Sequence, residues 1–334
     1  MIATAGVSVV NDVFDNVWVV LVIKTAVVIG FFLVAPLAVG YAEHKVLAHM
    51  QARLGPMEAG RFHGWAQLIA DGVKFIQKED VIPAAADRWV FTLAPGVAMI
   101  PYIALFVVIP FGSSVFAENL DIGIFYVMAM GSVSVIGVLM AGWASANKFS
   151  LIGALRAAAQ LIAYELPLVL AAAAVVVQAG TLSMIGITEA QTQYWYVLTQ
   201  PVGFFIFVVA SLAELTRPPF DMPVADSEII FGAYTEYTGL KFAFFLLAEY
   251  GGIVALSAIA SVLYLGGYRG VLGIPLPEPI WMAAKTGALA FFVIWLRATY
   301  PRLREDQLQR FSWLGLIPLA LLNIMVVATV KVAV

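Results

Sequence analysis

The chain has 334 residues, of which 62% are apolar and only 12% are charged, and its formal net charge at pH 7 is −3. This apolar share is more than a single soluble core can bury, so the composition excludes a water-soluble enzyme and a disordered protein. The chain contains no cysteine, which excludes disulfides, thiolate metal sites and iron–sulfur ligation by its own residues.

Long apolar runs dominate the sequence. A helix needs roughly 20 residues to cross the hydrocarbon core of a bilayer, so each run of about 18 or more apolar residues predicts a transmembrane helix. The fifth run is short and reaches that length only if its helix begins near Tyr196. The predicted fold is all-α, a single integral membrane domain over residues 1–334 with about eight transmembrane helices. The spans are 17–42, 90–111, 124–144, 157–178, 201–215, 242–265, 280–296 and 313–330.

The positions of lysine and arginine predict the orientation, because positively charged loops stay on the cytoplasmic side. The odd-numbered loops, which are rich in these residues, are predicted to be cytoplasmic, whereas the even-numbered loops carry only Arg269. Both termini then lie on the opposite side. Asp12 and Asp15 stand where a signal peptide would be basic, so we expect the first span to remain in the mature protein. The cytoplasmic loops are about 43–89, 145–156, 216–241 and 297–312.

The first cytoplasmic loop contains an amphipathic segment. Its apolar residues recur at helical spacing, and Gln67, Asp71, Lys74 and Lys78 take the other face. This pattern predicts a helix lying in the membrane interface. The sequence leaves open whether that helix supports the bundle or serves ligand access or partner docking. The apolar residues are Trp65, Leu68, Ile69, Val73 and Ile76.

Charged residues inside the apolar runs are the strongest functional signal. Glu165 lies in the fourth span, Glu214 at the end of the fifth and Glu249 in the sixth, with Lys24 and Lys285 in the first and seventh. An ionised side chain at mid-membrane costs about 2.5–3.5 kcal/mol on insertion scales, so such residues need a compensating role. One interpretation is a buried ion pair or a protonated glutamate that serves packing alone. Three carboxyls on different helices favour the other interpretation, a proton path.

The third cytoplasmic loop follows the fifth span and is unusually acidic. Arg217, Pro218 and Pro219 open it, and consecutive prolines force the chain out of the helix into an extended bend. Its acids either continue a chain of carboxyls toward Glu165 and Glu249 or form an ordinary solvated face. These acids are Asp221, Asp226, Glu228 and Glu236.

Several familiar catalytic motifs are absent. The sequence contains no P-loop, no GxGxxG after a strand, no HExxH and no serine nucleophile motif. His44, His49 and His63 share one loop but lack carboxylates at ligand spacing, so they are expected to be surface or interfacial residues rather than metal ligands. The sequence therefore predicts no catalytic residue, no redox centre and no metal in this chain, and any electron chemistry must belong to partners.

Six segments then identify a family. The sequence contains YAEHKVLAHMQARLGP, LIADGVKFIQKED, GWASANKFSLIGALRAAAQLIAYE, AELTRPPFD, SEIIFGAYTEYTG and YPRLREDQL. In this order they resemble the signature blocks of the H subunit of bacterial respiratory complex I, the counterpart of mitochondrial NADH dehydrogenase subunit 1. The resemblance extends from about residue 35 to residue 323, and AELTRPPFD and GALRAAAQ are its most specific parts.

The resemblance implies a membrane subunit of a proton-pumping NADH:quinone oxidoreductase. Such a subunit anchors the hydrophilic arm, forms most of the quinone access tunnel and starts the proton relay in a bacterial cytoplasmic membrane, with both termini periplasmic or external. Quinone, either ubiquinone or menaquinone, is the substrate, and FMN and iron–sulfur clusters belong to partner subunits. Expected partners are the quinone-site subunits of the hydrophilic arm, antiporter-like membrane subunits and lipids, without nucleic acid.

The resemblance also implies roles for residues that match the family by position. One group carries the proton relay, a second lines the quinone tunnel and a third docks the partner arm. The relay residues are Glu165, Glu214, Asp221, Asp226, Glu228, Glu236 and Glu249; the tunnel residues are Glu43, Lys45, Arg53 and Arg217; the docking residues are Arg302, Arg304 and Asp306.

The chain departs from the family pattern at several positions. Val224 stands where the family has a glutamate, and because a valine cannot relay a proton, either the path skips this position or Asp226 and water cover it. Asp226 itself replaces a second glutamate. The other departures are His44 for an arginine, Met57 for an asparagine, Arg61 for a proline and Leu314 for a lysine.

Other functions remain open at this stage. The nearest is the homologous membrane anchor of a membrane-bound hydrogenase or of a ferredoxin- or F420-linked dehydrogenase, which copurifying partners would distinguish. A stand-alone proton-coupled transporter has only the intramembrane acids in its favour, because no inverted repeat of broken helices is visible. A purely structural scaffold is the third alternative.

Overall fold

The computed structural model describes residues 17–270 and 275–333, except the side chains of residues 226 and 227, so Asp12 and Asp15 lie outside it. Every regular element in these ranges is a helix, which confirms the predicted all-α fold. In chain order the elements are α2 (Val17–Met50), α3 (Gln67–Gln77), α4 (Arg88–Val108), α5 (Gly123–Ala144), α6 (Lys148–Ala179), α7 (Met184–Ala190), α8 (Tyr196–Thr199), α9 (Pro201–Glu214), α10 (Asp226–Ile229), η1 (Gly232–Tyr234), α11 (Gly239–Tyr264), α12 (Glu278–Thr299), α13 (Glu305–Arg310), η2 (Phe311–Leu316) and α14 (Ile317–Ala333).

Seven helices in the described part of the chain are long and apolar enough to cross a membrane, which confirms a polytopic helical protein. The fifth predicted span differs from the other seven. It forms α9, whose 14 residues extend about 21 Å at roughly 1.5 Å per residue, less than the bilayer core. The one-turn helix α8 does begin at Tyr196, but Gln200 breaks the helix before Pro201. Gln200 is itself buried, and its backbone N–H and carbonyl groups are hydrogen-bonded to Tyr196 O and Phe204 N, so the break does not leave them unpaired in lipid.

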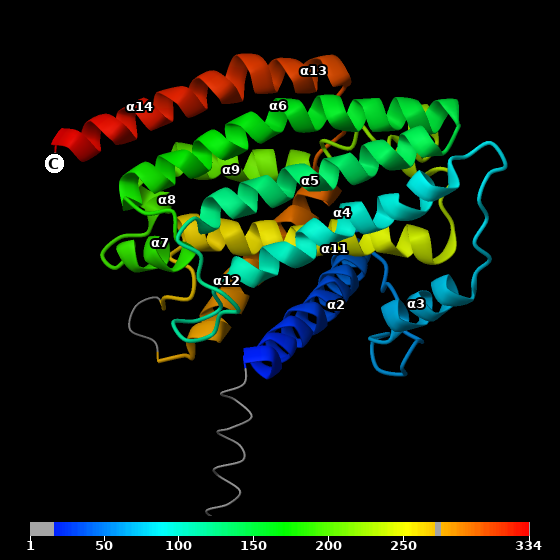
Figure 1. Ribbon diagram of the computed structural model, residues 1–334, viewed down its shortest axis with the longest axis horizontal. Helices are drawn as coiled ribbons and strands as arrows, with labels where there is room; N and C mark the ends of the chain where they lie inside the picture. The colour runs from blue at the N-terminus through cyan, green and yellow to red at the C-terminus, as the bar shows by residue number, and fades with distance from the viewer. Residues whose placement is uncertain (1–16, 271–274, 334) are drawn as a thin grey trace, which may run out of the picture.

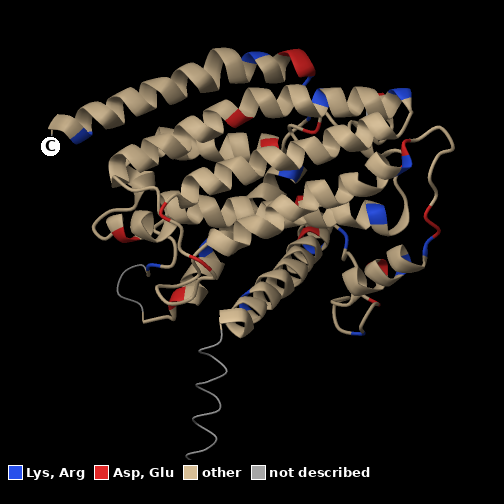
Figure 2. Ribbon diagram, viewed as in Figure 1, with Lys and Arg blue, Asp and Glu red and all other residues tan. Residues whose placement is uncertain are grey.

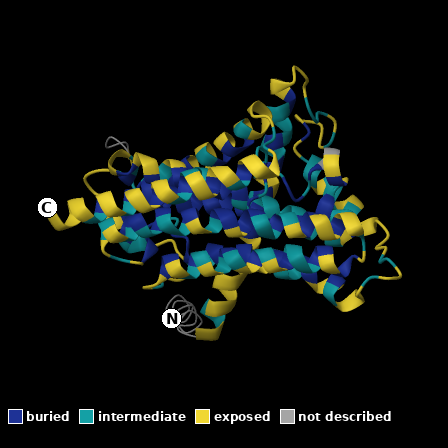
Figure 3. Cartoon of the chain, turned by 90° about the horizontal axis from the view of Figure 1, so that it is seen from above, coloured by how far each residue is buried: buried dark blue, intermediate teal, exposed yellow. Residues whose placement is uncertain are grey.

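The long helices form one bundle. Helices α4, α5, α6, α11 and α14 lie side by side with similar directions, whereas α2 and α12 are inclined to them (Figure 1). Buried residues fill the middle of the bundle and exposed residues cover its outside (Figure 3). Charged residues gather in the connections and near helix ends, with few along the middle (Figure 2). The interior is therefore apolar except at a small number of defined points.

Small residues allow the helices to approach closely, as is typical of membrane bundles. A Cβ atom on Gly137 of α5 would lie 2.4 Å from the backbone nitrogen of Ala98 on α4. A Cβ atom on Gly153 of α6 would lie 2.5 Å from the backbone nitrogen of Ala233. These glycines set the spacing of the elements that surround the site.

Helix α3 is the predicted amphipathic helix. Of its predicted apolar face, Ile69 is 51% exposed, Val73 48% and Ile76 69%. This face is not covered by the rest of the described chain, which fits a helix whose apolar side meets lipid or a partner.

The two intramembrane lysines have structural partners of their own. Lys285 donates to the carbonyl oxygens of Leu265, Gly267 and Arg269 at 2.6, 2.8 and 2.6 Å, so it satisfies backbone acceptors at the end of α11. Lys24 forms an exposed ion pair with Glu118 at 3.4 Å. Within the described ranges, neither lysine pairs with the glutamates of the spans.

Candidate functional site

Three adjoining cavities lie in a row inside the bundle. The loop-side cavity, about 200 Å³, is lined by the 216–231 segment, α11 and Arg297. The middle cavity, about 40 Å³, shares Tyr234 and Glu249 with it. The inner cavity, about 20 Å³ or room for about one water molecule, shares Glu214 with the middle one. Glu165 lies at the inner end, so the row connects carboxyls from four separate segments.

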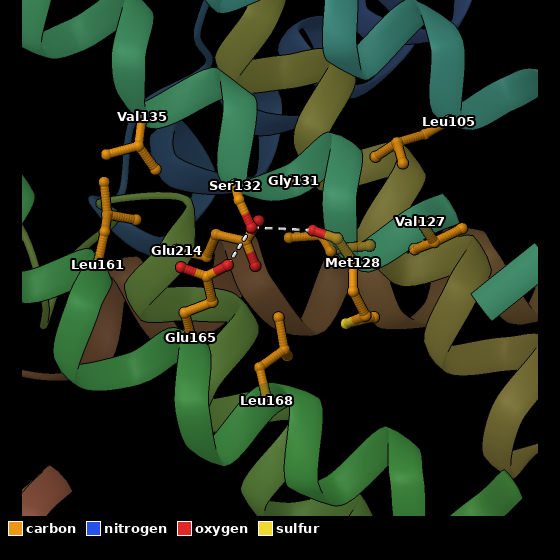
Figure 4. Close-up of a pocket in the computed structure, with 11 residues that line it drawn as sticks. Leu105, Val127, Met128, Gly131, Ser132, Val135, Leu161, Glu165, Leu168 and Glu214 are labelled. Carbon is orange, nitrogen blue, oxygen red and sulfur yellow. Dashed lines mark hydrogen bonds between the residues drawn. The ribbon is translucent and has the colours of Figure 1, made fainter. Parts of the chain in front are cut away.

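Two carboxyls and one serine hydroxyl group line the inner cavity. The Ser132 hydroxyl of α5 donates to Glu165 Oε1, and the side chains of Glu165 and Glu214 point into the same space (Figure 4). Gly131 makes room for them, because a Cβ atom there would lie 2.8 Å from Glu214 Oε1. Among the described residues no cation forms an ion pair with either glutamate, so the cavity holds carboxyls with no fixed countercharge.

Hydroxyl groups line the middle cavity between Glu249 and Glu214. Tyr102 Oη lies 3.4 Å from Ser134 Oγ, and both line the cavity. Burial, reinforced by the charge of Glu249, raises the pKa of Tyr234 above its ordinary value, so its phenol remains protonated at neutral pH. Protonated hydroxyls can both donate and accept hydrogen bonds. This cavity therefore contains groups able to pass a proton between the two carboxyls.

A buried ion-pair cluster lies beside the loop-side cavity. Arg217 is 1% exposed and hydrogen-bonds to Glu43, which also accepts from Arg297. Arg217 Nε lies 2.7 Å from Glu249 Oε1, and the guanidinium lies 4.7 Å from the centre of the Tyr250 ring. Two arginines thus face two carboxylates, with Arg217 and Glu43 buried and Arg297 and Glu249 partly exposed. We call Glu43, Arg217, Glu249 and Arg297 the arginine–carboxylate cluster.

The remaining loop acids have other surroundings. Arg302 bridges Asp221 at 2.8 Å and Glu228 at 2.9 Å, and Arg156 also pairs with Glu228. Hydrogen bonds from Arg156 and Arg302 lower the pKa of Glu228 below its ordinary value. Asp221 lines the loop-side cavity, whereas Glu228 is exposed and lines none of the three. Glu228 therefore belongs to a network that ties 216–241 to α6 and to the segment before α13.

A further relay candidate, Glu236, lines none of the three cavities. Glu236 accepts a hydrogen bond from Asn147, which also caps the start of α6, so its position suits a loop anchor. The side chain of Asp226 lies outside the described part of the chain. Val224 lines the loop-side cavity together with Asp221, so a carboxyl is present beside the valine.

The other predicted tunnel residues lie near the end of α2, Lys45 within the helix and Arg53 in the turn that follows it. Lys45 donates to the carbonyl oxygens of Leu54 and Pro56, and its Nζ lies 3.2 Å from Met57 Sδ. Arg53 donates to Gln51 at 2.8 Å. None of the three cavities includes Lys45 or Arg53.

The same turn accounts for one departure from the family pattern. Arg61 stands where the family has a proline and has a φ of 62°. Proline cannot adopt this value, because its ring fixes φ near −65°.

The docking residues differ in exposure. The Arg304 and Asp306 side chains are 74% and 55% exposed and lie 3.2 Å apart, whereas the Arg302 side chain is 25% exposed and engaged with loop acids. Arg304 and Asp306 are thus open to a partner, and Arg302 mainly orders the surface next to them.

Sequence reasoning assigned no role to the hydroxyl groups or to Arg297. Ser132, Ser134 and Tyr126 are the only residues with hydroxyl groups between residues 123 and 144. Their rarity in this apolar span could have marked them as candidate site residues. Arg297 is the first cation after a long apolar run and lies 254 residues from Glu43, so only the fold could bring the two together.

The fold and these cavities define a class of protein, a polytopic helical membrane protein with carboxyls and hydroxyls buried along its interior. Comparison with known proteins identifies the family. The family model described as NADH dehydrogenase matches residues 23–328. The chain is 46% identical to the H subunit of NADH-quinone oxidoreductase from Dehalococcoides mccartyi strain CBDB1, over 94% of this chain and 88% of that protein. It is 44% identical to the protein of the same name from Geobacillus kaustophilus, over 87% of each chain. The chain belongs to this family, the H subunits of NADH-quinone oxidoreductase, which confirms the resemblance drawn from the sequence.

Proposed function

We propose that this chain forms the quinone access tunnel and the start of the proton relay in a proton-pumping NADH:quinone oxidoreductase, and that it anchors the hydrophilic arm to the membrane. One observation carries the proposal: the three adjoining cavities line up Asp221, Glu249, Glu214 and Glu165. The names of the relatives support quinone as the substrate. FMN and iron–sulfur clusters are assigned to partner subunits.

In this proposal protons move along the cavities through carboxyls and hydroxyls in alternation. Glu249 lines both the loop-side and the middle cavities, Tyr102 and Tyr234 line the middle one, and Ser132 hydrogen-bonds to Glu165 in the inner cavity that Glu214 also lines. A new negative charge roughly 7 Å from a carboxyl changes the free energy of its protonation by about 2 kcal/mol at an effective dielectric constant near 20. That change is large enough to drive proton uptake or release.

The arginine–carboxylate cluster is the proposed link between quinone chemistry and the relay. Arg217 contacts Glu249, which also lines two of the cavities. An anion formed when quinone is reduced nearby would compete with Glu249 for Arg217. Weakening this ion pair would make Glu249 a stronger proton acceptor. Glu43, Lys45 and Arg53 complete the proposed tunnel on the α2 side.

We further propose the arrangement in the membrane. The loops about 43–89, 145–156, 216–241 and 297–312 face the cytoplasm of a bacterium, and both termini face the outside. Exposed Arg304 and Asp306 meet subunits of the hydrophilic arm, and antiporter-like subunits lie against the bundle. The exposed apolar face of α3 rests on lipid near the quinone entrance.

The test compares Glu214→Gln and Glu249→Gln with Glu189→Gln in the assembled complex. Glu189 is an exposed acid on α7 that lines none of the three cavities, and it serves as the matched control. Positioned proton-transfer groups contribute about 10²–10⁴-fold to rates, so each relay variant should lower quinone reduction and proton pumping at least about tenfold. Electron transfer from NADH to a soluble artificial acceptor should remain normal. Wild-type quinone reduction and pumping in both relay variants would overturn the relay.

A second function within the same superfamily is the membrane anchor of a hydrogenase or of a ferredoxin- or F420-linked dehydrogenase. The names of the relatives favour the NADH-linked complex. Mass spectrometry of copurified subunits decides between them: NADH-oxidising flavin subunits support the first function, and a nickel–iron subunit supports the second.

A further inference from the structure

A buried polar cluster lies where α8 ends and α9 begins, at the end of the bundle that carries α7 (Figure 1). Gln200, which is 1% exposed, occupies the break between the two helices. Its Nε2 donates to Ala174 O at 3.2 Å and to Gln178 Oε1 on α6. These two acceptors fix the amide orientation, so Gln200 Oε1 must point away from α6.

Two polar atoms in this cluster have no hydrogen-bond partner within the described part of the chain. They are Gln200 Oε1, an acceptor, and Asn323 Nδ2, a donor on α14. Asn323 is 8% exposed, so bulk water does not cover it. Buried polar atoms are nearly always satisfied, and an ordered water is one of the partners that can satisfy an acceptor and a donor together.

Both atoms, and a third polar atom, lie close to the position that a Cβ atom would occupy on Gly203. A Cβ atom on Gly203 would lie 3.1 Å from Asn323 Nδ2 and 3.3 Å from both Gln200 Oε1 and Tyr264 Oη. Tyr264 is fully buried and donates its hydroxyl hydrogen to Ala171 O at 3.0 Å, so its oxygen remains able to accept. One donor and two acceptors therefore lie around the open face of the glycine, close enough to one another for a single small molecule to contact all three.

We propose that Gln200, Asn323 and Tyr264 hold one ordered water molecule beside Gly203. The water donates to Gln200 Oε1 and Tyr264 Oη and accepts from Asn323 Nδ2, which satisfies both unpartnered atoms. Three hydrogen bonds are the usual number for a buried water. A methyl group or another apolar occupant would satisfy none of them.

The water has a polar route to the outside of the bundle. A cavity of about 540 Å³ lies between the end of α6, the α7–α8 connection and the end of α14. Gln178 and Thr199 line it and hydrogen-bond to each other at 3.0 Å, and Gln178 also bonds to Gln200. The water joins α9 to α11 and α14, so it fixes the position of the short helix whose other end carries Glu214.

The test is a cryo-EM map of the assembled complex at a resolution that shows other buried waters. We expect density within hydrogen-bonding distance of the three side-chain atoms in the wild type. Gly203→Ala should abolish it, and Gly287→Ala, whose Cβ atom would meet nothing within 4 Å, should leave it unchanged. Missing density in the wild type, density that survives in Gly203→Ala, or direct contact between Gln200 and Asn323 would each overturn the proposal.

X-ray hydroxyl-radical labelling gives an independent readout, because it oxidises side chains that touch ordered water. Tyr264 should be labelled in the wild type although it is buried, and the Gly203→Ala variant should reduce its labelling rate several-fold. The Gly287→Ala control should label Tyr264 at the wild-type rate. Equal Tyr264 labelling in the wild type and in Gly203→Ala would count against the water.

Discussion

Replacing Glu43 by glutamine tests how much the arginine–carboxylate cluster stabilises the protein. The substitution keeps the side-chain volume but leaves two guanidinium groups without their shared carboxylate. Arg297 is partly exposed, so its ion pair with Glu43 is screened by solvent, and losing that pair costs about 1 kcal/mol or less. Arg217 is buried, and removing one partner of a buried pair costs about 3–5 kcal/mol. Because Glu249 remains 2.7 Å from Arg217, the lower end of that range, about 3 kcal/mol, is expected.

The assay is thermal unfolding of the purified complex, followed by retention of this subunit on native gels. At about 2–4 °C per kcal/mol for a chain of this size class, Glu43→Gln should lower the midpoint by roughly 6–12 °C. Glu118→Gln, which breaks the exposed pair with Lys24, serves as the control and should shift it by no more than a few degrees.

A double variant distinguishes the loss of the ion pair from other causes of a lower unfolding midpoint. Glu43→Gln combined with Arg217→Gln should be more stable than the sum of the two single changes, because the double variant buries no unpaired charge in that pair. Additive losses, or a midpoint for Glu43→Gln within about 2 °C of the wild type, would refute the reasoning about desolvation.

Three further predictions address other parts of the molecule. Gly131→Ala should displace the carboxyl next to it and lower quinone-linked proton pumping with little change in thermal stability, whereas Gly96→Ala, with nothing near its Cβ atom, should preserve pumping. Lys285→Met should lower the midpoint of thermal unfolding by several degrees, because it removes three hydrogen bonds to buried carbonyl groups, each worth about 1–3 kcal/mol. The folded-state pKa of Glu228 is lowered, so its ion pairs stabilise the 216–241 segment above the ordinary glutamate pKa of about 4.5 and are lost as pH falls below it. Limited proteolysis of this segment should therefore accelerate at acidic pH, and Arg302→Gln should weaken that pH dependence.

The membrane spans were predictable because they depend on local composition. Apolar runs of sufficient length identify the seven long helices directly, and the amphipathic spacing identifies α3. The fifth span shows the limit of this reasoning. Its apolar run suggested one crossing, but a break at Gln200 separates α8 from α9, and the short helix α9 packs against α6, α11 and α14.

The site was predictable in its carboxyls but not in their grouping. Glu165, Glu214 and Glu249 stand out because charge is rare in apolar runs. Whether a carboxyl lines a cavity or forms an ion pair depends on partners that are distant in sequence. Arg302, for example, is 74 residues from its partner Glu228. Gly131 and Ser132 escaped notice because small residues are common in membrane helices for packing reasons alone.

The carboxyls of the site fall into two groups, those that pair with arginines and those that do not. Glu43 forms ion pairs with two arginines and Glu228 with two others, so these carboxylates hold neighbouring segments in place. Glu165 and Glu214 have no ion-pair partner among the described residues and share a cavity large enough for about one water molecule, so holding both ionised there is costly. Glu249 belongs to both sets, since it pairs with Arg217 and also lines the cavities. A change in the Arg217–Glu249 contact would therefore affect an ion-paired carboxylate and the lining of the cavities at the same time. For this reason a conservative Arg217→Lys substitution, which keeps the charge but loses the planar guanidinium fork, should impair proton pumping more than it impairs assembly.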